Sequence, residues 1–178
     1  MEELLDKPSK PFYKFGDVIY LKTIPEEYWI SFICDKFQSC GITIPQELAL
    51  KICRSVSNHS SYVQQLSWLI YCETEGNVVT EENFRSALDV LLEQNNDLFE
   101  AQIDGLSALQ RNLLSAVAHG LNDHLNYTEN LKKYHLGSAA AVNAARKSLI
   151  TKGFLLFTNS KLQLSDPVLG LWLLKKMG

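Results

Sequence analysis

Apolar residues between positions 23 and 104 recur at intervals of three and four, which is the spacing of one face of an α-helix. The pattern predicts four helices, whose inner faces carry Trp29, Phe32, Ile33 and Phe37; then Leu48, Ala49, Ile52 and Val56; then Val63, Leu66, Leu69 and Ile70; and last Ala87, Leu88, Leu91, Leu92, Leu98 and Phe99. Helix starts are indicated at Pro25 and Pro45, in the segment 58–61, and at Thr80. We therefore expect a helical bundle over residues 23–104.

The pattern changes at Asp104-Gly105, where we place a domain boundary. Beyond it, Ser107 and Thr128 are suited to cap two helices, and a third is expected over residues 139–152. Residues 154–164 then have the pattern of a strand, a turn and a second strand, and a final helix follows Pro167. Three helices followed by a hairpin predict a winged helix over residues 105–178, so the expected fold is mainly α, a helical bundle followed by a winged-helix domain.

Residues 16–21 are different, because they form one short run that is apolar on both faces, as in a buried parallel strand. No other strand-like run occurs before residue 154. A strand of this kind without a sheet suggests that residues 1–22 end a domain that lies mostly outside this sequence.

Composition narrows the classes of protein. No apolar run approaches the ~20 residues that cross a bilayer, and the N-terminus lacks the basic start of a signal peptide, so we expect no membrane contact and a cytoplasmic location. The four cysteines have no metal-ligand spacing, and we expect them to act as small buried hydrophobes, with no metal site.

The net charge of −3 hides an asymmetry between the two halves of the chain. Residues 1–104 carry 8 Lys and Arg against 17 Asp and Glu, whereas residues 105–178 carry 9 against 3. Such a division indicates either nucleic-acid binding by the basic half or an electrostatic contact between the halves.

In a winged helix, the predicted 139–152 helix is the element that enters the major groove of DNA. Helical spacing directs Val142, Ala145 and Leu149 inward and leaves polar and basic side chains outside. The candidate nucleic-acid-binding residues are Lys132, Lys133, Asn143, Arg146, Lys147, Lys152 and Lys161. The alternative is that the same side chains form a solvated face of a winged helix that contacts protein.

Several segments, taken in order, resemble one family. They are Pro11-Phe12-Tyr13, the 16–21 strand, the Asn58-to-Leu66 segment, Leu106-Ser107, and Asp166-Pro167 ahead of Trp172-Leu173. The chain resembles the C-terminal half of prokaryotic P-loop ATPases of the AAA+ and STAND type. The resemblance implies that residues 1–22 end the nucleotide-binding core, that 23–104 are a four-helix lid, and that 105–178 are the appended winged helix.

The same resemblance assigns nucleotide sensing to Asn58, His59 and Ser60, at the start of the third lid helix, when a core is present. Ser60 stands where the family usually has proline, and a simple Asn or Ser helix cap is the alternative. A helix N-terminus with free amides suits a phosphate or a ribose oxygen.

No GxxxxGK[ST] loop and no strand ending in paired acids occurs, so we expect no enzymatic activity from this chain alone and no cofactor. ATP and Mg²⁺ belong only to a full-length parent. The expected partners are the missing ATPase core and either duplex DNA or a protein, with a homodimer also open. Two alternatives remain: a stand-alone winged-helix regulator, and an interaction adaptor that docks through residues 16–21 or through the Trp172 helix.

Overall fold

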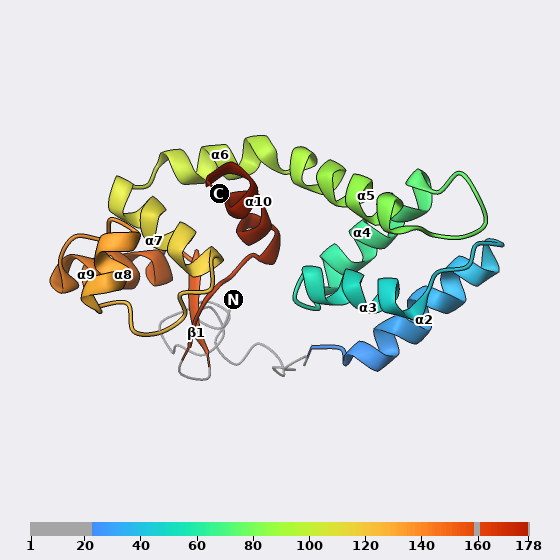
Figure 1. The fold of residues 1–178 in the computed structure, drawn as a ribbon, viewed down its shortest axis with the longest axis horizontal. Coiled ribbons are helices and arrows are strands. Elements are labelled where there is room, and N and C mark those ends of the chain that lie inside the picture. Colours follow the sequence, from blue (N-terminus) through green and yellow to red (C-terminus); the bar gives the residue numbers. More distant parts are fainter. Residues whose placement is uncertain (1–22, 159–160, 178) are drawn as a thin grey trace, which may run out of the picture.

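The computed structural model describes residues 23–158 and 161–177, and the predicted strand at 16–21 lies outside them. Between residues 23 and 104 the chain forms α2 (Glu26–Ser39), α3 (Gln46–Ser55), α4 (Ser60–Glu73), α5 (Glu81–Gln94) and α6 (Asn96–Asp104). α2 to α5 pack as one lobe, from which α5 and α6 run as an arch to the second half of the chain (Figure 1). We call residues 23–104 the helical lobe.

The local signals in the sequence explain where the helices of this lobe begin. The Thr80 side chain accepts from the Asn83 backbone N–H, and the Asn83 side chain accepts from the Thr80 N–H, which is a capping box. Val79 and Phe84, on either side of this cap, are both buried. The predicted hydrophobic staple at the start of α5 is therefore present.

The predicted fourth helix is divided in two. α5 ends at Gln94, and the Asn95 side chain donates to the carbonyl oxygen of Leu91 before α6 begins. A side chain that bonds to the backbone of the preceding turn competes with the helical ladder. As a result, Leu98 is 55% exposed and the prediction that it faces inward is wrong, whereas Phe99 is fully buried.

Phe32, which was assigned to an inner face, is also exposed, and so is Trp68. Phe32 and Trp68 are 46% and 62% exposed, and they line an apolar groove of about 340 Å³ between α2 and α4. Helical spacing places a residue on a face, but the width of the buried stripe depends on what packs against it. The cysteine prediction is wrong in the same way, because only Cys53 is buried and both Cys40 and Cys72 are exposed.

The second half contains α7 (Ala108–Ala118), α8 (Thr128–Lys133), α9 (Ala139–Thr151), β1 (Leu155–Thr158), β2 (Lys161–Leu164) and α10 (Pro167–Met177). β1 and β2 are antiparallel, with Leu155 opposite Leu164 and Thr158 opposite Lys161. Val142, Ala145 and Leu149 are buried, as the spacing predicts. The predicted order of helices and strands is confirmed, and the fold is mainly α.

The last helix, α10, returns to the helical lobe and packs on both α7 and α5 (Figure 1). Trp172 is 6% exposed, and its ring meets that of Phe99 edge to face at a centroid distance of 5.9 Å. Gly170 allows α10 to pass close to β2, because a Cβ atom there would lie 2.9 Å from Leu164 Cδ1. The apolar side of α10 thus packs inside this chain, and Trp172 is buried and not available to a partner.

None of the helices in residues 23–158 and 161–177 combines the length and the apolar composition that crossing a bilayer requires.

Candidate functional site

The predicted sensing turn joins α3 to α4 in an uncommon backbone conformation. Ser57 and Asn58 have φ values of 51° and 56°, so two successive residues other than glycine lie in the left-handed region. The turn is fixed by backbone hydrogen bonds from Asn58 N to Cys53 O at 2.8 Å and from His59 N to Val56 O at 2.9 Å. Such a conformation persists only where the surroundings hold it in place.

The Asn58 side chain ties this turn to α2. Its Nδ2 donates to Glu26 Oε1 at 3.4 Å, and the same carboxylate accepts from the Arg54 guanidinium at 3.0 Å. The hydrogen bond from Arg54 is the main reason that the pKa of Glu26 lies below its ordinary value. Asn58 Oδ1 is buried and has no hydrogen-bond partner among the described residues.

The first turn of α4 is left without a side-chain cap. The N-cap residue is His59, whose side chain accepts no capping hydrogen bond, so the alternative of a simple Asn or Ser cap is wrong. The backbone N–H groups of residues 60–62 have no acceptor among the described backbone carbonyls. Free amides at a helix N-terminus can donate to an anionic or hydroxyl oxygen.

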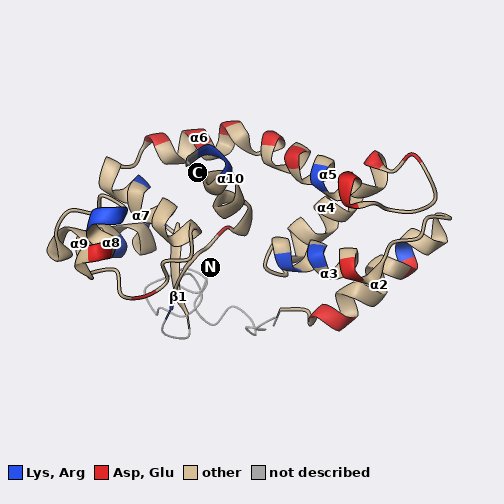
Figure 2. Cartoon of the chain, viewed as in Figure 1, with Lys and Arg blue, Asp and Glu red and all other residues tan. Residues whose placement is uncertain are grey.

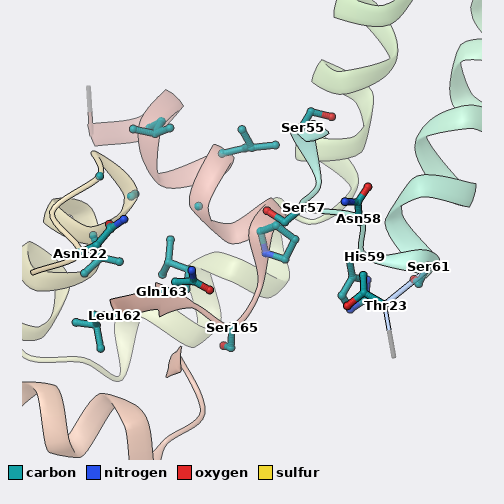
Figure 3. A pocket seen from close by; sticks show the side chains of 18 of the residues that line it. Thr23, Ser55, Ser57, Asn58, His59, Ser61, Asn122, Leu162, Gln163 and Ser165 are labelled. Atoms are coloured by element: carbon teal, nitrogen blue, oxygen red, sulfur yellow. The ribbon is translucent and has the colours of Figure 1, made fainter. Parts of the chain in front are cut away.

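This turn forms one wall of a cleft of about 950 Å³ between the two halves of the chain (Figure 3). Asn122, Gln163 and Ser165 belong to the facing wall, with apolar side chains of α7 and α10 between the walls. The described lining includes no Lys, Arg, Asp or Glu. The cleft therefore offers hydroxyls, amides and the His59 imidazole, which suit a neutral polar group better than a polyphosphate with its metal ion.

The structure places the candidate nucleic-acid-binding residues in α8, in and just after α9, and in β2. Lys132 and Lys133 are in the last turn of α8, Asn143, Arg146 and Lys147 are in α9, Lys152 is the C-cap of α9, and Lys161 begins β2. All are exposed except Arg146, which is half-buried. Asn143 and Lys147 lie one turn apart, so α9 brings these two side chains to the same face.

The six cations of this group form no ion pair with any residue in the described part of the chain. Apolar side chains are exposed in the same elements, since Ile150, Leu156 and Phe157 are 38%, 50% and 59% exposed. Leu156 and Phe157 are neighbours in β1 and therefore point to opposite sides of the strand. We call the exposed residues of α9 and β1 the α9–β1 surface. Its apolar part was missed, although the all-apolar run at 154–157 was a signal for it.

Other cations of the basic half lie at the end of α10, near the acidic residues of α5 and α6 (Figure 2). Lys175 Nζ lies 2.6 Å from Asp89 Oδ1 on α5, and Lys176 Nζ lies 3.2 Å from Glu100 Oε1 on α6. The charge asymmetry therefore reflects, at least for these residues, an electrostatic contact between the halves. That contact does not involve the cations of α8, α9 and the hairpin.

The profile of a protein family described as "Probable winged helix domain" matches residues 97–175. Together with three helices followed by an antiparallel hairpin, this match decides the fold of the second half. Residues 97–175 form a winged helix. The match begins in α6, so the family's unit includes the helix that follows Asn95 as well as α10.

Among solved structures, the chain is similar to the Walker-type ATPase paby2304 of Pyrococcus abyssi, with a TM-score of 0.64 and 14% sequence identity. The similarity covers 94% of this chain and 47% of the ATPase, so the chain spans about half the length of that structure. At this identity the similarity concerns the fold of the helical lobe and the winged helix together. No curated protein matches the sequence.

Proposed function

We propose that this chain is the C-terminal lid and winged-helix part of a P-loop ATPase of the AAA+ or STAND type, in which the lid transmits the nucleotide state of the core to the winged helix. The observation that carries the proposal is the likeness of nearly the whole chain to about half of a Walker-type ATPase. In this account the chain is not an enzyme, and ATP and Mg²⁺ are bound by the core, which also holds residues 1–22.

The geometry of the cleft supports a sensing role for Asn58, His59 and Ser60. Their turn supplies free amides and hydroxyls at the junction with the winged helix, but the described lining has no cation for a triphosphate. We therefore expect the chain alone to show no saturable ATP binding by calorimetry. Micromolar affinity of the isolated chain for ATP would contradict this assignment.

The winged helix, in the same proposal, binds duplex DNA through α9 and the hairpin. Cations that no described acid neutralises remain available to phosphates. If about four of the six cations contact phosphates, affinity should fall about a hundredfold between about 50 and 200 mM salt.

An electrophoretic shift on duplex DNA tests this binding. The double change Arg146→Glu and Lys147→Glu should abolish the shift. Lys36→Glu with Arg85→Glu alters the net charge equally but in the helical lobe, and this variant should retain most of the shift. No shift of the unaltered chain at low salt would reject DNA binding.

A protein partner is the second candidate, and the exposed apolar residues of the α9–β1 surface favour it. Leu156 and Phe157 are exposed in β1, and Lys147 and Lys152 are exposed in α9 and at its C-cap. Such a mixture suits a protein surface with apolar and acidic groups. In this case Phe157→Ser should impair partner binding while leaving any DNA shift unchanged. The roles of stand-alone regulator and of homodimer are tested by light scattering on the isolated chain.

A further inference from the structure

One hydrogen bond joins the sensing turn to the winged helix across 104 residues of sequence. The Tyr62 hydroxyl, in the first turn of α4, donates to Asp166 Oδ2 at 2.8 Å. Tyr62 follows the turn directly, and its ring lies 5.0 Å from the His59 imidazole between centroids. A movement of the turn therefore changes the position of this hydroxyl.

Asp166 also makes hydrogen bonds to the N-terminus of α10. Its Oδ1 accepts from the backbone N–H groups of Val168 at 2.8 Å and Leu169 at 3.1 Å, so the carboxylate caps α10. α10 in turn packs on α7 of the winged helix and on α5 of the helical lobe. A single carboxylate thus connects the sensing turn with the N-terminus of the helix that joins the two halves.

The Tyr62 hydroxyl stays protonated and therefore acts as the donor of this hydrogen bond. Burial and the neighbouring Asp166 carboxylate raise the pKa of the Tyr62 phenol far above its ordinary value. The hydroxyl consequently keeps its proton over the whole physiological pH range, and the bond to an ionised carboxylate is of the stronger, charge-assisted kind.

The other end of the link is a strained turn. Ser57 and Asn58 occupy the left-handed region, and the contact of Asn58 with Glu26 is only partly buried and near the limit of a hydrogen bond at 3.4 Å. A strained turn is held in place by its contacts, so a change in those contacts can release it.

We propose that the Tyr62–Asp166 hydrogen bond is the link by which a change in the 57–59 turn reaches α10 and the winged helix. The proposal rests on the proposed function, because it supplies the contact through which the lid would act. Its test uses neither nucleotide nor DNA. The link can therefore be rejected while the ATPase assignment stands, and the ATPase assignment can be rejected while the link stands.

The test is a double-mutant cycle read by hydrogen exchange of the Val168 and Leu169 amides. Asn58→Ala removes the contact with Glu26 and puts alanine at positive φ, which disturbs the turn. In the otherwise unaltered chain we expect it to speed exchange of the two amides about fivefold. In the Tyr62→Phe background it should add less than about twofold, since the link is already broken.

Equal effects of Asn58→Ala in both backgrounds, or no effect in the first, would overturn the proposal. A purely structural hydrogen bond would give such equal effects, because independent contributions add. His135→Ala, another positive-φ residue but between α8 and α9, is the control and should leave both amides unchanged.

A second variant tests the acceptor side of the link, and a buried amide elsewhere controls for general unfolding. Asp166→Ser keeps a capping oxygen for α10 but removes the acceptor of Tyr62, and it should suppress the Asn58→Ala effect as Tyr62→Phe does. Exchange of the buried Leu91 amide in α5 must stay unchanged in every variant. If Asp166→Ser leaves the Asn58→Ala effect intact, the link does not run through this carboxylate.

Discussion

The indole Nε1 of Trp172 donates to Asn96 Oδ1 at 3.1 Å, so the last helix of the chain is bonded to the first residue of α6. The two residues are 76 positions apart in sequence, and one belongs to the arch while the other belongs to the final helix. Apolar contact with Phe99 completes the joint. The position of α10 against α6 therefore depends on both this hydrogen bond and this aromatic contact.

Two substitutions of Trp172 distinguish the contribution of its hydrogen bond to stability from that of its packing. Trp172→Phe keeps an aromatic ring but leaves Asn96 without its donor, and we expect it to lower the free energy of unfolding by about 1 kcal/mol. Trp172→Ala also leaves a cavity, and the expected loss is about 3 to 5 kcal/mol. Urea unfolding followed by circular dichroism measures both. The matched control is Trp68→Ala, which removes a 62% exposed indole and should cost less than about 1 kcal/mol.

The ion pairs at the end of α10 predict a dependence on salt. Lys175→Glu with Lys176→Glu turns two attractions to Asp89 and Glu100 into repulsions. Because all four side chains are about half exposed or more, the unaltered pairs contribute less than about 1 kcal/mol each. The variant should unfold at lower urea concentration in low salt, and the difference should shrink at about 1 M salt. A difference that does not depend on salt would show that packing, not charge, is affected.

Glu26 predicts a dependence on pH. Its folded pKa is lowered from 4.5, mainly by the hydrogen bond from Arg54, so its contribution is present above the unfolded value and is lost as pH falls through the folded value. In the Arg54→Gln variant, the pKa of Glu26 in the folded chain moves closer to its pKa in the unfolded chain. The unfolding free energy of this variant should therefore be lower than that of the unaltered chain near about pH 7, and the two should converge below about pH 4. Parallel pH profiles would contradict this role of Arg54.

The cysteines should differ in reactivity towards iodoacetamide. Burial, with a smaller effect of the Glu26 charge, raises the pKa of Cys53 to about 11, and its side chain is fully buried. Cys40 and Cys72 are exposed and should be alkylated first in the folded protein. Mass spectrometry of digested peptides should find Cys53 unmodified until the chain is unfolded. Early labelling of Cys53 would show that α3 opens in the native state.

Local signals in the sequence predict much of this fold. Thr80 and Ser107 each form a capping box, and the strand, turn and strand pattern at 154–164 predicts the hairpin, because these features depend on neighbours within a few residues. The break at Asn95 was not predicted, since apolar spacing continues across it. The exposure of Phe32 and Trp68 depends on the absence of a described element over the α2–α4 groove, which no local pattern records.

The geometry of the candidate site, too, could not be predicted from local sequence patterns. Residues 58–61 were identified from the sequence, but the cleft they form with Asn122 and Gln163 depends on how the halves pack. The bond between Tyr62 and Asp166 joins residues far apart in the chain. Both residues stand in segments that carry the family resemblance, yet nothing in the spacing indicates that they meet.

The central claim is that this chain completes a nucleotide-binding core that it does not itself contain. The most direct measurement extends the chain through the reading frame upstream of Met1, then compares ATP binding of the extended and the present chains by calorimetry. We predict a GxxxxGK[ST] loop in the added sequence and saturable binding by the extended chain alone, weakened by Asn58→Ala. An upstream sequence without such a loop, or equal binding of ATP by both chains, would contradict the account.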